Sequence, residues 1–367
     1  MIQVVNNDHE FSKYINDAYK EMPEVYACVN KLQSVPLRVN KKIFEILNTA
    51  VTKNIRLECL PDFNFDEYRN SKQQQYDVYQ TRLKTTDHDA RYFYLLSDFM
   101  DANKARALSI SRAVKLAKKY LNEPEFYNTM MCDFRGRMYT SSELSFMQHD
   151  CTRAMLEFSK GKKLKTKLGV EAFKIHGANL AGKSKESYSD RLKFIDTNEK
   201  NILEVVKDPI ENKWWIDVAK EKSWQFLAFC FEYKNYKELG TKHISHLPIQ
   251  IDATASLLQH ISMITKDKEL AEKTNLIKNE KPYDIYTEIL EEAEAILHNE
   301  YHEEHAVESE FVYSEQHKKY IKVPTNKFYA GVWSTVKLTR DLIKQAVIGT
   351  VFGGGKHTLK TYIFKEF

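Results

Sequence analysis

The sequence Leu247-Pro-Ile-Gln-Ile-Asp-Ala-Thr-Ala-Ser-Leu-Leu-Gln-His260 decides the predicted fold, because its hydrophobic period changes midway. In its first half, Leu and Ile alternate with other residues, which predicts a strand with one buried face. From Ala255 onward, apolar residues recur every three or four positions, which predicts a helix. Asp252 therefore lies at a predicted strand end, where a carboxylate can project into a cleft.

Two roles fit Asp252. A carboxylate at a strand end suits Mg²⁺, which binds a few oxygen ligands and keeps waters and substrate phosphates for its other positions. An Asp just before a helix also commonly serves as the helix N-cap. Taken alone, this stretch favours the N-cap, so the choice depends on the rest of the chain.

A second pattern lies near the C-terminal end of the sequence. Residues spaced four apart form one stripe along a predicted helix: Arg340, Lys344, Ile348 and Phe352. Two cations at this spacing repel, so the arrangement makes sense where an anion such as a triphosphate lies along that face. Three glycines from Gly353 end the helix. An exposed basic helix face is the alternative.

The chain resembles the single-subunit RNA polymerases of phage and mitochondrial type. Three motifs carry the resemblance in the family's order: Asp133-Phe-Arg-Gly-Arg137, Asp252-Ala-Thr-Ala-Ser-Leu-Leu-Gln-His260 and Arg340-x3-Lys344-x7-Phe352-Gly353. Further segments are similar: Pro36-Leu-Arg-Val-Asn-Lys-Lys42, Lys174-Ile-His-Gly-Ala-Asn179, Asn212-Lys-Trp-Trp215, Phe226-Leu-Ala-Phe-Cys-Phe-Glu-Tyr233 and Asp284-Ile-Tyr286. The resemblance covers roughly residues 30 to 358. It implies a central portion of the polymerase, without the N-terminal promoter-binding region and the C-terminal His-Asp motif.

The resemblance implies a mixed α/β, mainly α-helical fold that forms a right-hand polymerase core. Residues 1–127 would hold a linker and the helical thumb, residues 128–265 the palm with the first catalytic Asp, and residues 266–367 the start of the fingers. The implied activity is DNA-templated RNA synthesis, in which a nucleotide is transferred from a ribonucleoside triphosphate by a two-metal mechanism.

The resemblance also implies roles around the nucleotide. Asp252 would bind both catalytic Mg²⁺ ions, while Lys344 would act in catalysis and hold the triphosphate together with Arg340. Tyr286 and Phe352 would border the templating base and the incoming nucleotide. The family usually carries Tyr where Phe352 stands, so weak discrimination against deoxynucleotides is expected. Next to it, Gly353 would let the template approach.

The Asp133–Arg137 motif places two arginines around a glycine. Such a turn lets the backbone approach a phosphate while guanidinium groups bind it. A structural turn closed by an Asp–Arg pair is the alternative. The resemblance favours nucleic-acid binding, with Asp133 and Arg137 near the template hybrid, and it extends this role to Arg135 and Lys174.

Residues 104–119 predict a basic helix surface. Six basic residues and no acid surround an apolar stripe: Lys104, Arg106, Arg112, Lys115, Lys118 and Lys119. Such a surface would grip phosphates, with affinity that falls as salt rises. A solvated helical face is the alternative. Similarity to the family's thumb favours nucleic-acid binding, through Arg112 and Lys115 among others.

Two-metal chemistry needs a second carboxylate, which the family carries in a His-Asp motif after the Arg/Lys helix. His149-Asp150 precedes that helix and is therefore in the wrong order. We expect one subunit of a split polymerase whose partner chain supplies the second ligand, with DNA template, RNA product and ribonucleoside triphosphates as further partners. An inactive truncated fragment and a nucleic-acid-binding protein are the alternatives. A phage-encoded enzyme in the cytoplasm of an infected cell is expected in preference to a mitochondrial one.

A competing motif lies between Gly177 and Ser184, which match the phosphate-loop pattern G-x-x-x-x-G-K-[ST]. Such a loop must follow a strand, whereas the residues around Gly177 keep helical spacing. A P-loop NTPase is therefore the weaker hypothesis. Farther along, residues 311–313 and 320–323 flank a polar turn and predict a hairpin.

Composition limits the remaining possibilities. The chain has 367 residues, 43% of them hydrophobic, so it can bury a sizeable core. Its 55 basic and 51 acidic residues leave a net charge of only +4, so a nucleic-acid-binding surface must be local. Five cysteines form no CxxC pair, which argues against a zinc site or disulfide framework. The sequence has no signal peptide and no apolar run long enough to span a bilayer.

Overall fold

The computed structural model describes residues 21–64, 70, 87–133, 136–279, 281–302, 309–314, 318–351, 353–357, 359 and 361. The chain forms two compact units. Unit 1 consists of Met1–Ser184 with Tyr188–Gln250, and unit 2 consists of Lys185–Ser187 with Ile251–Phe367. The predicted thumb, palm and finger ranges stay a prediction.

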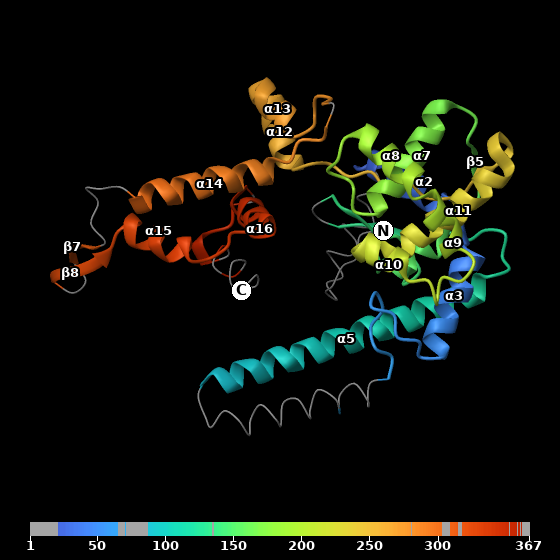
Figure 1. Cartoon of the computed structure of the whole chain (residues 1–367), viewed down its shortest axis with the longest axis horizontal. Coiled ribbons are helices and arrows are strands. Elements are labelled where there is room, and N and C mark those ends of the chain that lie inside the picture. Colours follow the sequence, from blue (N-terminus) through green and yellow to red (C-terminus); the bar gives the residue numbers. More distant parts are fainter. Residues whose placement is uncertain are drawn as a thin grey trace. The chain divides into compact units, whose positions relative to one another are not determined.

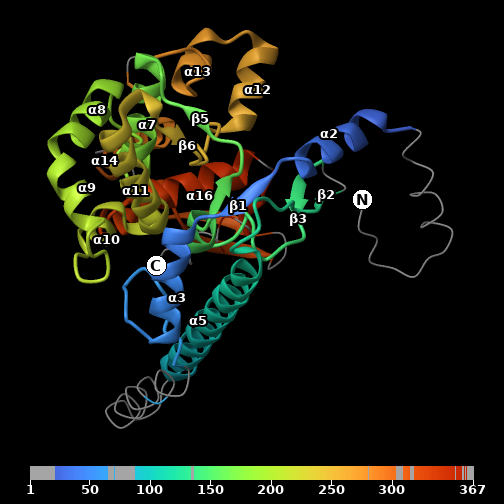
Figure 2. The same ribbon diagram turned by 90° about the vertical axis from the view of Figure 1, so that its right-hand side faces the viewer.

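The described part of unit 1 is mainly helical and carries three small antiparallel strand pairs, β1–β4, β2–β3 and β5–β6 (Figures 1 and 2). Its α-helices are α2 (Pro23–Gln33), α3 (Lys41–Thr52), α5 (Asp87–Tyr120), α6 (Asp150–Ala154), α7 (Lys167–Leu180), α8 (Tyr188–Thr197), α9 (Glu199–Val205), α10 (Trp214–Ala219) and α11 (Ser223–Leu239). Two 3-10 helices flank α11, η2 (Lys220–Lys222) and η3 (Gly240–Lys242). Its strands are β1 (Leu37–Val39), β2 (Met130–Cys132), β3 (Met138–Thr140), β4 (Leu156–Phe158), β5 (Lys162–Lys163) and β6 (Ile244–Ser245).

Helix α11 is the centre of the unit 1 core. It is apolar around most of its circumference, the composition of a helix packed on all sides. Its buried aromatic residues include Trp224, Phe226, Phe229 and Tyr233. Helices α3, α6, α7, α9 and α10 all pack against it. The core of unit 1 is therefore formed by α11 and by the helices that surround it.

Asp150 explains how α11 begins. The residue before this helix, Lys222, makes no side-chain cap hydrogen bond. Asp150 at the start of α6 caps it instead, because its carboxylate accepts from the Trp224 N–H at 2.7 Å and from Gln225 Nε2 at 2.8 Å. Burial raises the pKa of Asp150, although these hydrogen bonds oppose the shift. In the structure, the Asp of the His149-Asp150 pair thus forms a half-buried cap of α11.

Helix α5 confirms the predicted amphipathic helix before Tyr120. Ile110, Val114 and Ala117 are buried, and α5 packs against α3, as Figure 2 also shows. The six basic residues of residues 104–119 are all exposed. The helix therefore presents a basic surface around a buried apolar stripe.

The P-loop hypothesis is wrong. Helix α7 continues through Gly177 to Leu180, whereas a phosphate loop would need a strand followed by a sharp loop. Gly177 is buried, and a Cβ there would lie 2.2 Å from Cζ of Phe229. This glycine is needed for the close packing of α7 on α11.

The predicted strand at residues 247–251 is also wrong. The segment pairs with no described strand, and Ile249 and Ile251 are 50% and 93% exposed. Pro248 has no N–H to donate to a neighbouring strand, which disfavours pairing. The helical half of the motif is confirmed as α12 (Ser256–Thr265).

Unit 2 consists of helices and one hairpin in its described part (Figure 1). After α12 come α13 (Lys268–Lys273), α14 (Ile285–His302), β7 (Ser309–Ser314), β8 (Lys319–Pro324), α15 (Asn326–Ser334) and α16 (Arg340–Val351). Strands β7 and β8 pair antiparallel with Phe311 opposite Lys322, which confirms the predicted hairpin. Helices α15 and α16 both pack on α14.

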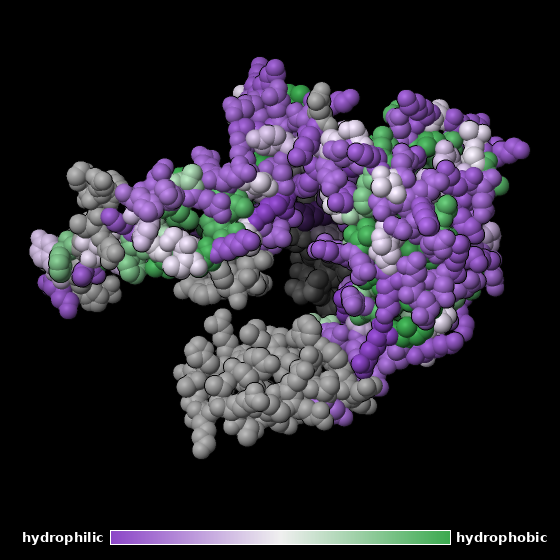
Figure 3. All heavy atoms as spheres, in the orientation of Figure 1, coloured by the Kyte–Doolittle hydropathy of each residue, from purple (hydrophilic) through white to green (hydrophobic). Residues whose placement is uncertain are grey.

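The fold class is mixed α/β and mainly helical, as predicted. Most side chains visible in Figure 3 are hydrophilic, and the hydrophobic ones form small separate groups. Among the described helices, none combines the length and the apolar composition that crossing a membrane requires.

Candidate functional site

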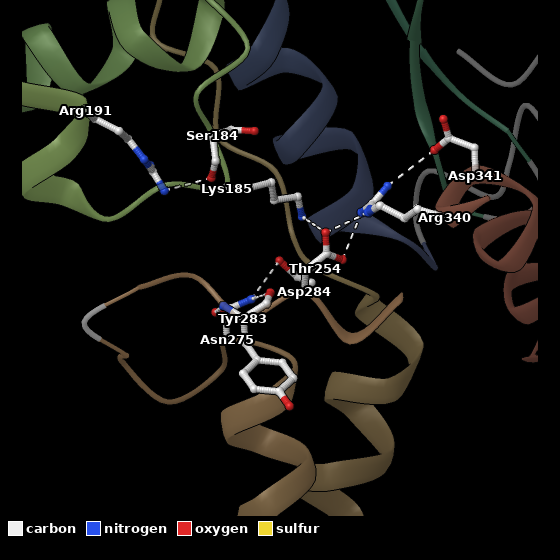
Figure 4. Close-up of polar contacts among 9 residues, drawn as sticks. All are labelled: Ser184, Lys185, Arg191, Thr254, Asn275, Tyr283, Asp284, Arg340 and Asp341. Atoms are coloured by element: carbon white, nitrogen blue, oxygen red, sulfur yellow. Dashed lines mark hydrogen bonds and ion pairs between the residues drawn. The ribbon is translucent and has the colours of Figure 1, made fainter. Parts of the chain in front are cut away.

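Arg340 opens α16 and is held by a carboxylate from the start of α14. Its Nε lies 2.7 Å from Oδ2 of Asp284, and its Nη2 lies 3.0 Å from Oδ1 (Figure 4). The guanidinium carbon also lies 5.3 Å from the centre of the Tyr286 ring. A two-pronged ion pair and an aromatic face together fix the direction of this side chain.

Lys185 belongs to the same cluster. Its Nζ lies 3.5 Å from Oδ2 of Asp284, so two cations share one carboxylate. Burial alone would raise the pKa of Asp284, but hydrogen bonds and charge from Arg340 and Lys185 outweigh it and hold that pKa below its usual value. Asp284 is therefore ionised at neutral pH and pairs with both cations.

Asn275 connects this cluster to the loop that contains Asp252. The Tyr283 N–H donates to Asn275 Oδ1 at 2.7 Å, and Asn275 Nδ2 donates to the Tyr283 carbonyl at 2.8 Å. The same Nδ2 lies 3.4 Å from Oγ1 of Thr254. The Asn275 side chain thus links the backbone of Tyr283, next to Asp284, to Thr254, which lies two residues after Asp252.

The structure decides against the N-cap role for Asp252. Helix α12 begins at Ser256 with Ala255 as its N-cap, and no side chain caps it. The Asp252 carboxylate accepts from the Ala253 N–H, at 2.8 Å, through Oδ1, and the residue is exposed. Its Oδ2 accepts no hydrogen bond from the described residues. No cluster of three or more His, Cys, Asp or Glu side chains within the described residues could hold a metal ion.

The remaining predicted nucleotide residues follow Arg340 along α16. Lys344 lies one turn further on, is half-buried, and has no ion-pair or hydrogen-bond partner in the described part of the chain. Phe352 lies outside the described residues. The φ of Gly353 is +78°, and its N–H donates to the Thr350 carbonyl at 2.9 Å, so this glycine ends the helix as predicted.

In unit 1, the Asp133–Arg137 motif forms the turn between β2 and β3. Asp133 Oδ1 accepts from the Arg137 N–H at 2.9 Å, and the φ of Gly136 is +80°. The carboxylate therefore orders the turn, while the Arg137 side chain remains exposed. Arg135 lies outside the described residues.

The other residues of unit 1 that are predicted to bind nucleic acid differ in their exposure and in their ion pairs. Lys174 Nζ pairs with Asp196 Oδ1 at 2.5 Å, which joins α7 to α8. Arg112 is exposed on α5 and contacts Glu143 at 3.2 Å, and Lys115 is exposed. The nucleic-acid roles of these residues stay predictions.

Sequence reasoning missed the two residues that organise Arg340. Asp284 lies in a segment similar to the polymerase family, but no pattern in the sequence predicts a role for it or for Lys185. Neither has a periodic signal, because both precede helices in loops and meet only through the fold. The informative sign was a carboxylate two residues before a predicted nucleotide-binding Tyr.

Comparison with known proteins agrees with the motifs. The profile of the DNA-dependent RNA polymerase family matches residues 163–367. The chain is 29% identical over 350 residues to T7 RNA polymerase of Escherichia phage T7, covering 94% of this chain and 39% of that protein. It is 32% identical over 280 residues to the DNA-directed RNA polymerase of Enterobacteria phage T3, covering 75% of this chain and 30% of that one.

A mitochondrial enzyme is similar too. The chain is 30% identical over 281 residues to the mitochondrial DNA-directed RNA polymerase of Schizosaccharomyces pombe, covering 74% of this chain and 23% of that protein. It thus spans about two fifths or less of the length of each of these relatives. On the match of the family profile over more than half of its residues, this chain belongs to the DNA-dependent RNA polymerase family of phage and mitochondrial type.

Proposed function

We propose that this chain takes part in DNA-templated RNA synthesis and binds the triphosphate of the incoming ribonucleotide. The observation that carries this proposal is the ordered Arg340 at the start of α16, with Lys344, which pairs with no described residue, one turn further along. Phosphates prefer a fixed guanidinium and a nearby ammonium because both are charge-assisted donors. Similarity to RNA polymerases supports nucleotidyl transfer to an RNA 3′ end as the proposed reaction class.

We also propose Asp252 as a ligand of the catalytic Mg²⁺ ions. Its exposed carboxylate fits Mg²⁺, which usually takes one or two carboxylates and fills its other positions with water and phosphate oxygens. The metal ions would polarise the phosphate and activate the attacking hydroxyl. Asp252 would hold them beside the triphosphate that Arg340 and Lys344 bind.

Two-metal chemistry needs at least one further carboxylate. His149-Asp150 precedes the Arg/Lys helix and Asp150 caps α11, which supports our proposal that this ligand comes from a second polymerase subunit. RNA extension by this polypeptide alone would contradict the need for a second subunit.

The nucleic acid would be bound by unit 1. The exposed basic face of α5 suits phosphates of a template–product duplex, and the ordered Asp133–Arg137 turn presents an exposed arginine. On this proposal, residues 1–127 include the thumb, residues 128–265 the palm and residues 266–367 the start of the fingers.

Equilibrium binding of GTP with Mg²⁺ tests the nucleotide role. Arg340→Gln and Lys344→Gln should each weaken GTP binding by about tenfold, because each removes one charge-assisted contact. Lys337→Gln is the matched control, since it removes an exposed positive charge from unit 2 just before α16 and should leave the affinity within about twofold. If all three variants bind GTP like the wild type, the proposed triphosphate site is wrong.

A further inference from the structure

The geometry of the Arg340–Asp284 pair leaves one edge of the guanidinium available. A guanidinium has five N–H donors arranged around a plane. Asp284 accepts from Nε and Nη2 and therefore occupies the side-on edge. Among the described residues, the end-on edge, formed by Nη1 and Nη2, meets the exposed Asp341 alone, at 3.4 Å from Nη1. This second edge can still receive a phosphate in a two-pronged contact.

The surroundings of Arg340 fix that edge in space. The Tyr286 ring, itself only 6% exposed, covers one face of the guanidinium. Lys185 contacts the same Asp284 carboxylate and brings a second positive charge close by (Figure 4). The arginine is thus held on one edge and one face before any nucleotide is present.

Asn275 in turn fixes Asp284. Both hydrogen bonds between the Asn275 side chain and the Tyr283 backbone are short, at 2.7 and 2.8 Å. Asn275 adopts a φ of +58°, a left-handed conformation that Asn tolerates better than most residues. Because Nδ2 also reaches Thr254 at 3.4 Å, the clamp ties Asp284 to the loop that carries Asp252.

We propose that Asp284, clamped by Asn275, is a positioning residue that aims the end-on edge of Arg340 at the phosphates of the incoming nucleotide. This inference rests on the proposed triphosphate role of Arg340 and assigns a new residue to it. Pre-ordering Arg340 removes the entropy cost of ordering a long side chain when the nucleotide binds. The opposite hypothesis is that Asp284 competes with the triphosphate for Arg340.

The two hypotheses predict opposite changes in GTP affinity. If Asp284 positions Arg340, Asp284→Asn weakens binding of GTP with Mg²⁺ by about five- to tenfold, although the change removes a negative charge. Asn275→Ala keeps every charge and should weaken binding by about threefold. Glu292→Gln is the control, because it removes an exposed acid of α14, the helix that follows Asp284, and it should change affinity less than twofold.

A double-mutant cycle separates positioning from general damage to the fold. When Arg340→Gln is already present, adding Asp284→Asn should cause no further loss, since Asp284 acts only through Arg340. Thermal unfolding of each variant checks that it is folded. If Asp284→Asn does not fold, the same cycle is run with Asn275→Ala.

The outcomes distinguish this inference from the proposed function. Unchanged or tighter GTP binding by Asp284→Asn, or losses that add fully to those of Arg340→Gln, would overturn the positioning role while leaving Arg340 as a phosphate ligand. A folded wild-type chain that binds no GTP would contradict the proposed triphosphate site itself and the positioning role with it.

Discussion

Replacing Gly177 by Ala tests whether α7 packs on α11 as closely as the structure shows. In an ordinary helix interior this change stabilises by about 1 kcal/mol, because Ala has the higher helix propensity. Here the new Cβ would lie 2.2 Å from Cζ and 2.4 Å from Cε1 of Phe229. The ring has little room to retreat, since it is fully buried and its centre lies 4.9 Å from that of Phe173. Overpacking of this kind costs about 1–3 kcal/mol and more when neighbours are fixed, so a net loss of about 2 kcal/mol is expected.

Urea unfolding followed by tryptophan fluorescence measures this loss. Three of the four tryptophans lie in unit 1, so the signal reports mainly on that unit. Gly169→Ala is the control within the same helix, because its Cβ would meet only the Thr166 hydroxyl, at 3.1 Å, and a change below about 1 kcal/mol is expected. Phe229→Leu should partly relieve the Gly177→Ala defect, with a coupling energy of about 1–2 kcal/mol. Stabilisation by Gly177→Ala would refute the close packing of α7 on α11, and the hypothesis of a loop at Gly177 would have to be considered again.

Three further predictions follow from buried and surface charges. Burial, and then the charge of Lys222, lowers the pKa of His176 from 6.5 to about 4, so the unfolded state binds more protons between these values. The free energy of unfolding should therefore fall by about 3 kcal/mol as pH drops from 6.5 to 4, and His176→Gln should remove that slope in urea titrations. Asp150→Ala strands the donors at the start of α11 and should cost about 3 kcal/mol by the same method, whereas an unchanged midpoint would rule out the cap. The double variant Arg112→Gln/Lys115→Gln should bind a primer–template duplex with a weaker salt dependence, so that the steepness of the fall in log affinity with log salt decreases by about 2. An unchanged steepness would exclude both residues as phosphate contacts.

Helices with a clear period were predictable from the sequence. The stripe that starts at Arg340 predicted α16, and Gly353 supplied its end because a glycine can adopt the positive φ that the helix terminus needs. The apolar spacing around Ile110 predicted the buried face of α5. Two short segments rich in aromatic and β-branched residues, on either side of a polar turn, predicted the β7–β8 hairpin. Each of these signals is local, so no knowledge of distant contacts was needed.

Features that depend on tertiary partners were not predictable. Alternation at residues 247–251 predicted a strand, but a strand forms only where a neighbour accepts its hydrogen bonds, and none does so among the described residues. The Asp284 cluster joins side chains from positions as far apart as Lys185 and Arg340. Gly177 belongs to a phosphate-loop pattern in sequence, yet its role is set by the Phe229 ring on another helix. In each case the decisive contact is remote in the chain.

The central claim is that this chain contributes a metal-binding carboxylate and a triphosphate site to RNA synthesis. It is tested most directly by RNA extension on a DNA template, using the chain isolated with any polypeptide that accompanies it. Asp252→Asn should lower the extension rate about a thousandfold, because metal ions contribute several kcal/mol to such reactions, and should leave duplex affinity within about twofold. Glu292→Gln removes an exposed acid of the same unit and should retain near-normal extension. Near-normal extension by Asp252→Asn, or no templated extension by the wild-type assembly, would contradict the account.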